Sequence, residues 1–161
     1  MEIIAANEPS ELDTVKALFR EYFQSLAIDH GLEISYQGID DELTTLPGDF
    51  APPHGRLVLA VQSGQAVGCA GLRPLSPTVC ELKRMYVPPP HRGHGVGKAL
   101  ALTLIHEARE IGYRQMRLDT ATFLTAAMKL YESLGFRPIA PYNEMPEDLR
   151  RVAVHMELDL V

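Results

Sequence analysis

Three glycines at alternate positions, Gly93, Gly95 and Gly97, precede a stretch whose apolar spacing predicts a helix. Such a junction leaves successive backbone N–H groups without helical partners, and the helix dipole adds partial positive charge there. Because glycine has no Cβ, a phosphate can approach these amides closely, and Arg92 and Lys98 add charge beside them. The pattern predicts an anion-binding loop rather than an ordinary flexible turn.

The loop departs from two common nucleotide-binding motifs. The triphosphate-binding loop GxxxxGK[ST] would need glycine where Arg92 stands and Ser or Thr where Ala99 stands. The dinucleotide motif GxGxxG would need glycine at Lys98 and a parallel βαβ unit, whereas the strands before the loop suggest an antiparallel meander. The sequence therefore indicates a different class of phosphate-bearing ligand.

Three segments in the same order resemble the GNAT superfamily of acetyl-CoA-dependent N-acetyltransferases. The loop RGHGVG at 92–97 fits R-x-x-G-x-G, ELKRMYV at 81–87 precedes it, and AMKLYESLGF at 127–136 follows it. The resemblance covers residues 56–136 well and, in the order of strands and helices, the whole chain. Three ordered motifs are far more specific than a glycine loop alone.

The resemblance implies an α/β (α+β) fold and one domain over residues 1–161. Its sheet is expected to be mixed, mostly antiparallel and of about seven strands, flanked by about four helices, with a splayed slot between the fourth and fifth strands. It also implies acetyl-CoA as cosubstrate, with pantetheine along one strand end and the pyrophosphate on the loop amides. The expected cofactor-binding residues are Met85, Tyr86, Val87, Arg92, Gly93, His94, Gly95, Val96, Gly97 and Lys98.

Two catalytic residues follow from the same resemblance. Tyr131 aligns with the tyrosine that gives a proton to the departing CoA thiolate, and Glu81 stands where many members carry the base that deprotonates the amine. A thiol pKa near ~8.5 and a phenol pKa near ~10 make the first transfer feasible when the thiolate forms, and an amine with a pKa near ~10 must lose its proton before it attacks at neutral pH. For Glu81, an equal alternative is a solvated strand carboxylate or an ion-pair partner of Arg84 or Lys83. Leu124 replaces a frequent asparagine of the family, so that cofactor contact is not carried over.

Periodicity and turn residues predict the elements that position these groups. Three prolines at 88–90 end one strand and prevent a neighbour from pairing with its end, which leaves room for the cofactor. The expected elements are a strand at 2–6, a helix from Pro9 to about Leu26, an acidic, loop-rich segment at 27–50 with a short helix ending at Pro47-Gly48, antiparallel strands at 56–62, 66–72 and 78–87, a helix from Val96 to Gly112, a strand at 114–119, a helix at 124–134 and a strand at 152–160.

The composition excludes several partners. Fifteen Lys and Arg against 21 Asp and Glu give a net charge of −6, which disfavours nucleic acid and anionic membranes. No apolar run approaches the ~18 residues of a membrane span, and the start lacks a leader, so a cytoplasmic protein is expected.

Cys69 and Cys80 are expected to be thiols that face each other across a hairpin, and the six histidines are expected to form no metal site. Exposed strand edges near the C-terminus leave a homodimer open.

The acceptor is expected to be a small-molecule amine, acetylated by direct attack in a ternary complex. Segment 27–50 holds no Lys or Arg and six acids, and Glu144, Glu147 and Asp148 lie in a late loop, which together favour a small cationic amine. An amino acid remains open if Arg73 or Arg84 reaches the cleft to pair with its carboxylate, and a protein amine is a further alternative. Two rival classes are a non-catalytic acyl-CoA-binding module and a magnesium-dependent phosphate-ligand enzyme.

Overall fold

The computed structural model describes residues 1–32 and 36–161. Its strands are β1 (Glu2–Ala5), β2 (Arg56–Gln62), β3 (Gln65–Pro74), β4 (Val79–Tyr86), β5 (Gln115–Ala121), β6 (Arg137–Ile139) and β7 (Ala153–Asp159). Its α-helices in these ranges are α1 (Pro9–His30), α2 (Tyr36–Thr45), α3 (Val96–Ile111), α4 (Thr125–Ser133) and α5 (Glu147–Val152). Short 3-10 turns lie at Gly48–Phe50 and Pro89–His91.

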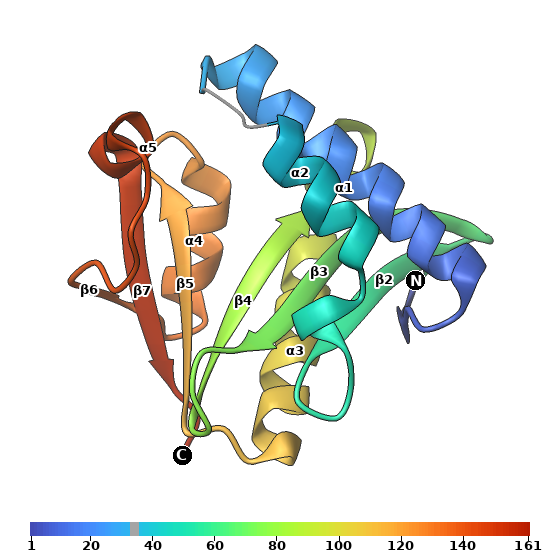
Figure 1. Ribbon diagram of the computed structural model, residues 1–161. Coiled ribbons are helices and arrows are strands. Elements are labelled where there is room, and N and C mark those ends of the chain that lie inside the picture. The colour runs from blue at the N-terminus through green and yellow to red at the C-terminus, as the bar shows by residue number, and fades with distance from the viewer. Residues whose placement is uncertain (33–35) are drawn as a thin grey trace.

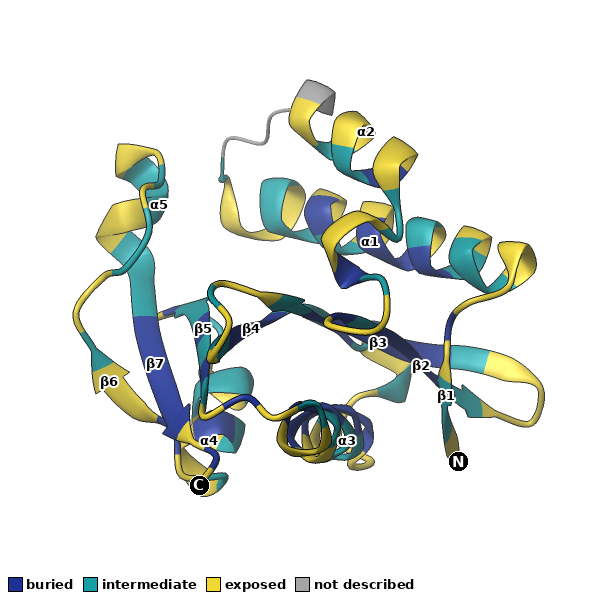
Figure 2. Ribbon diagram, turned by 60° about the horizontal axis from the view of Figure 1, so that its bottom comes forward, coloured by how far each residue is buried: buried dark blue, intermediate teal, exposed yellow. Residues whose placement is uncertain are grey.

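All seven strands form one mixed sheet in the order β1-β2-β3-β4-β5-β7-β6. The strands β2, β3 and β4 are the predicted antiparallel meander, and only the β4–β5 pair is parallel. The expected fold class is confirmed, including the sheet of about seven strands. Helices α1 and α2 cover one face of the sheet, and α3 and α4 cover the other (Figures 1 and 2).

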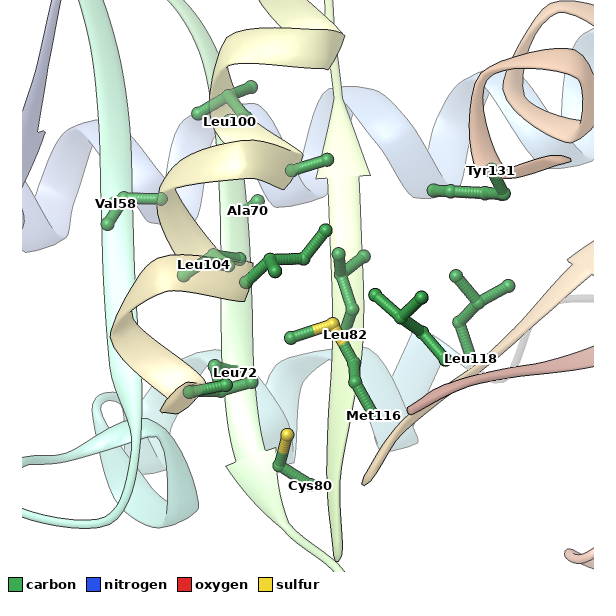
Figure 3. Close-up of a cluster of buried hydrophobic side chains, with 14 of the residues drawn as sticks. Val58, Ala70, Leu72, Cys80, Leu82, Leu100, Leu104, Met116, Leu118 and Tyr131 are labelled. Atoms are coloured by element: carbon green, nitrogen blue, oxygen red, sulfur yellow. The ribbon is translucent and has the colours of Figure 1, made fainter. Parts of the chain in front are cut away.

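Each face of the sheet buries its own apolar cluster. Helix α3 presents Leu100, Leu104 and Ala108 to the strands, and Figure 3 shows the first two packed over β3 and β4. On the opposite face, Phe19 and Phe23 of α1 belong to a second buried cluster that includes Phe50. The two faces therefore hold the central strands rigidly, and these strands carry the site.

Helix α1 is longer than predicted because nothing interrupts it before Gly31. Glu11 accepts a hydrogen bond from the backbone N–H of Glu8 at 3.3 Å, which completes a capping box at its start. Gly31 ends the helix in the left-handed conformation at φ 64°. The expectation of a loop-rich segment at 27–50 is wrong for the described part, which is largely helical; Glu33, one of its six acids, lies outside the described residues.

The register of the β3–β4 hairpin overturns the expected placement of the two cysteines. A β-bulge between the pairs Gly71–Lys83 and Cys69–Tyr86 places two residues of β4 opposite one residue of β3. Independently of this bulge, β3 runs on to Pro74, so Cys80 lies opposite Pro74 and the two cysteines do not face each other. Both are buried free thiols, as expected. Burial raises the pKa of each thiol, which keeps the two groups protonated and inert.

Strands β4 and β5 pair over only three residues of each strand. The pairs run from Val79 with Gln115 to Glu81 with Arg117, and beyond them the strands diverge (Figure 1). The chain leaves β4 through Pro88 into a 3-10 turn, so no protein strand fills the gap. The predicted slot between the fourth and fifth strands is therefore present.

Candidate active site

The glycine loop joins β4 to α3 and is fixed at its start by Arg92. The Nε–H of Arg92 donates to the carbonyl of Val87 at 2.8 Å, and its guanidinium lies 5.9 Å from the ring centre of Tyr86. Gly93 and Gly95 adopt positive φ angles of 80° and 82°, which side chains with a Cβ rarely adopt. The sequence therefore needs glycine at these two positions for the backbone to turn.

The N-terminus of α3 offers its amides to a ligand. Gly95 is the N-cap residue, no side chain caps the helix and its first turn contains no acid. The N–H groups of the first turn have no partner within a helix. A Cβ added at Gly93 or Gly95 would meet no atom within 4 Å, so space is open in front of the loop. This geometry suits a phosphate or pyrophosphate group.

A cavity of about 560 Å³ begins at the loop and follows the gap between β4 and β5. Every predicted cofactor-binding residue except His94 lines it. Leu124 lines it from the opposite wall, together with residues 125–127 of α4. The free backbone edge of β4 beside Met85 offers hydrogen-bonding groups that the sheet does not use. The residues present therefore fit a long molecule with amide groups and a pyrophosphate, such as acyl-CoA.

Tyr131 projects from α4 into the same cavity. It is buried, and its ring packs edge-on against Phe136 with centroids 5.7 Å apart (Figure 3 shows its position). Burial raises the pKa of the phenol above its ordinary value of 10.0, and nearby Tyr22 and Asp119 raise it further. Tyr131 is therefore a protonated group at neutral pH.

Glu81 lies apart from this cavity. Its side chain is 1% exposed and lines neither of the two cavities described here. Its carboxylate accepts a hydrogen bond from Arg73 Nε at 2.9 Å and from the Tyr142 hydroxyl at 2.5 Å, and Lys83 Nζ lies 3.9 Å away. Glu81 therefore forms an ion pair, which is the structural alternative to a catalytic role. Its principal partner is Arg73 and not Lys83 or Arg84.

The model of the Acetyltransferase (GNAT) family matches residues 12–136 of this chain. The chain belongs to the GNAT family. An uncharacterized N-acetyltransferase of Schizosaccharomyces pombe is 37% identical over 148 residues, covering 91% of this chain and 88% of that protein. The chain is accordingly an acyltransferase of the N-acetyltransferase type.

Solved GNAT structures share this fold across the whole chain. A GNAT acetyltransferase of Staphylococcus aureus superposes with a TM-score of 0.80 at 22% identity, covering 99% of both chains. The yncA protein of Salmonella typhimurium, solved with its cofactor acetyl-CoA, gives a TM-score of 0.73 at 22% identity, covering 99% of this chain and 94% of that one. These likenesses show the fold.

A second cavity of about 430 Å³ adjoins the first in this GNAT domain. It lies between α1, α2, the end of β5 and α5. Seven residues line both cavities, namely Tyr22, Leu26, Arg84, Asp119, Thr120, Phe123 and Leu124. The two cavities therefore meet beside the splayed ends of β4 and β5, which is where a second substrate would approach the first.

Asp119 is the carboxylate at this junction, and sequence reasoning missed it. Lys83 Nζ and Asn143 Nδ2 each donate to its Oδ2 at 2.9 Å, and His155 Nε2 lies 2.7 Å from Asn143 Oδ1. A signal was available, because Asp119 lies near the C-terminal end of β5, a strand parallel to its neighbour β4, and ligands often bind at such strand ends. Its partners come from β4, β7 and the loop before α5, which sequence spacing does not bring together.

The described residues contain no group of three or more His, Cys, Asp and Glu that could hold a metal ion. In the same part of the chain, no helix has the length and apolar character needed to cross a bilayer.

Replacing Gly95 by alanine is expected to weaken acetyl-CoA binding about tenfold, because the backbone at φ 82° presents the loop amides. Gly64→Ala is the matched control, since Gly64 has φ 74°, equally open surroundings and a position in the turn between β2 and β3. Both variants should lose about 1–2 kcal/mol of stability. Calorimetric titration should detect weaker binding for Gly95→Ala alone; equal affinity in both variants would contradict the role of the loop.

Asp119 should make stability depend on pH in the acid range. Burial favours the neutral acid, but Lys83, Asn143 and His155 together hold its pKa below the ordinary value of 3.8. The folded state thus binds this proton less readily than the unfolded chain, so the stabilisation is complete above about pH 4 and is lost as the pH falls through the folded pKa. The free energy of unfolding in urea should fall more steeply between pH 5 and pH 2 for the wild type than for Asp119→Asn. Parallel curves would contradict this origin of the pH dependence.

Proposed function

We propose that this protein transfers an acetyl group from acetyl-CoA to the primary amine of a small molecule, by direct attack within a ternary complex. The observation that supports this most is the meeting of two cavities beside Asp119 and Tyr131. One cavity has the loop and strand edge that fit acyl-CoA, and the other is free to hold an acceptor. A single junction between them allows the amine to reach the thioester without a covalent enzyme intermediate.

The residues of the first cavity bind and orient the cosubstrate. The loop amides from Arg92 to Lys98 hold the pyrophosphate, and the open edge of β4 from Met85 to Val87 pairs with pantetheine. Acetyl-CoA supplies the activated thioester carbonyl. A Cβ at Gly97 would lie 3.5 Å from Leu130 and 3.7 Å from Met85, which are ordinary van der Waals contacts, so packing within the chain does not require glycine at this position.

Tyr131 is the proton donor in this proposal. Attack by the amine expels a thiolate, whose conjugate thiol has a pKa near ~8.5. The raised pKa of Tyr131 keeps its proton in place until the thiolate forms. The side chain of Tyr131 lines the first cavity, and Tyr22 and Asp119, which line both cavities, are close enough to raise its pKa further.

The amine-facing carboxylate is better supplied by Asp119 than by Glu81. Asp119 lines both cavities and is ionised at neutral pH because of its lowered pKa. Glu81 lines neither cavity, and both of its oxygens already accept hydrogen bonds. We propose that Asp119, in place of the Glu81 predicted from the sequence, binds the incoming ammonium and the water that removes its proton.

The acidic residues expected to attract a cationic amine are largely paired or dispersed. Glu42 forms an ion pair with Arg84 at 2.8 Å, and Glu147 forms one with Arg151 at 3.1 Å. Asp29 lines the cofactor cavity rather than the second one. A small amine is still the acceptor that the volume of the second cavity favours. These contacts give little support to the expectation that the acceptor amine carries a high positive charge.

The proposed function is tested by calorimetric titration with acetyl-CoA, CoA and ATP plus magnesium, followed by thiol release with a panel of primary amines. We expect binding of the two CoA species, no binding of ATP, and thiol release that depends on the amine. Binding without thiol release for any amine would leave a non-catalytic acyl-CoA-binding module. Binding of ATP with magnesium in place of CoA would refute the proposal.

A further inference from the structure

Arg84 stands in a strained position that directs it toward the junction of the two cavities. It is one of the two residues in the β4 bulge and has a positive φ of 59°, which is rare for a residue other than glycine. Such a conformation costs about 1–3 kcal/mol and is retained where the fold needs the side chain in an unusual direction. The guanidinium lies 4.9 Å from the ring centre of Phe23 and lines both cavities.

Glu42 of α2 holds only one side of this guanidinium. Arg84 Nε and Nη2 donate to the two carboxylate oxygens at 3.0 and 2.8 Å. A guanidinium carries five N–H donors in a planar fork, so the side that bears Nη1 is not used by this ion pair. The two side chains remain 23% and 20% exposed, so an incoming carboxylate can bind beside Glu42 or replace it.

The remaining wall of the second cavity is apolar. Leu26, Ile39, Met145, Leu149 and Val152 line it, and its charged lining residues in the described chain are Glu42, Arg84 and Asp119. Lys83 neutralises Asp119 as Arg84 neutralises Glu42. The junction thus presents a cation and an anion side by side without a net charge. A zwitterion matches this arrangement, whereas a polyamine would leave ammonium groups facing apolar carbon.

We propose that the acceptor is a free amino acid with an apolar side chain. Arg84 binds its carboxylate, Asp119 faces its ammonium group, and the apolar wall of the second cavity holds its side chain. The proposal rests on the proposed acetyltransferase function. The amine nitrogen forms a bond to the acetyl carbon as the C–S bond breaks, and Tyr131 gives a proton to the departing sulfur. The ammonium group loses two protons in all: one replaces the proton that Tyr131 gave up, and the other goes to solvent.

The first test compares L-phenylalanine with amines that lack its carboxylate. Thiol release from acetyl-CoA is measured with L-phenylalanine, L-phenylalaninamide, phenethylamine and spermidine. We expect kcat/KM for L-phenylalanine to exceed that for phenethylamine at least 30-fold. In addition, 3-phenylpropionate, which has the carboxylate but no amine, should inhibit competitively against L-phenylalanine.

The second test assigns this preference to Arg84. In Arg84→Gln the ratio of kcat/KM for L-phenylalanine over phenethylamine should fall to about 1, and inhibition by 3-phenylpropionate should disappear. Arg73→Gln is the matched control, because Arg73 is a neighbouring arginine bound to Glu81 that lines neither cavity. Its ratio should stay at the wild-type value. Thermal unfolding of both variants establishes that they are folded.

The outcomes separate this inference from the proposed function. Acetylation of phenethylamine or spermidine in preference to L-phenylalanine would overturn the amino acid proposal and leave the acetyltransferase intact. A wild-type ratio in Arg84→Gln would remove Arg84 from carboxylate recognition. Thiol release with none of the amines, despite tight acetyl-CoA binding, would refute the proposed function itself.

Discussion

Replacing Tyr131 by phenylalanine is expected to lower the single-turnover rate of thiol release about 10²- to 10³-fold, while acetyl-CoA affinity stays within about twofold. The change removes the hydroxyl group and leaves the edge-on ring contact with Phe136 intact. Because the hydroxyl proton matters only as the thiolate forms, its loss should affect the transition state and not the bound ground state. Rapid mixing measures the rate, and calorimetric titration measures the affinity.

Two further tyrosine variants make this test specific. In Tyr113→Phe the lost hydroxyl donates to the His54 carbonyl at 2.8 Å, away from both cavities, so the rate should be unchanged. Tyr22→Phe removes a phenol that lines both cavities, whereas Tyr131 lines the first cavity only. If the rate of thiol release is unchanged in Tyr131→Phe and falls strongly in Tyr22→Phe, Tyr22 is the proton donor and Tyr131 is not.

Replacing Asp119 by asparagine is expected to lower kcat/KM for the amine about 100-fold at neutral pH, because the carboxylate at the junction is lost. Asparagine has nearly the same shape, so the contact with Asn143 can be rearranged without leaving a cavity. The measurement is thiol release as a function of amine concentration between pH 6 and pH 10. A larger effect on KM than on kcat would indicate binding of the ammonium group.

Glu81→Gln is the comparison that decides between the two carboxylates. We expect it to preserve the shape of the pH–rate profile and to lower stability by about 1–3 kcal/mol, since Arg73 and Tyr142 lose a charged acceptor in a buried position. A flattened profile in Glu81→Gln, with a normal profile in Asp119→Asn, would establish Glu81 as the base and reject Asp119.

Local sequence patterns were sufficient for the parts of the site that are local in the chain. The glycine loop, the start of α3 and the position of Tyr131 on α4 each depend on a few consecutive residues and their helix signals. The prolines at 88–90 also predicted correctly that β4 would end beside an open slot. These features needed no knowledge of which distant strands are neighbours.

The parts that sequence reasoning missed depend on register and on contacts between distant segments. The bulge at Arg84 changes which residues of β4 share a face, and no turn residue or proline marks it. The expectation that the cysteines face each other failed because β3 runs on to Pro74, so the hairpin turns later in the chain than its prolines suggested. At the junction, Asp119 of β5 contacts Lys83 of β4, and elsewhere Tyr142 contacts Glu81, which lies 61 positions away in the chain. Sequence spacing alone could not reveal either contact.

The short pairing between β4 and β5 implies a trade-off between stability and activity. A continuous ladder would add backbone hydrogen bonds at the centre of the sheet, each with a net contribution of about 1 kcal/mol, in a domain whose total stability is of the order of 5–15 kcal/mol. The same N–H and C=O groups are the ones offered to the cosubstrate. Stabilising substitutions that extend the pairing past Glu81 and Arg117 would therefore yield a more robust protein that had lost its catalytic cleft.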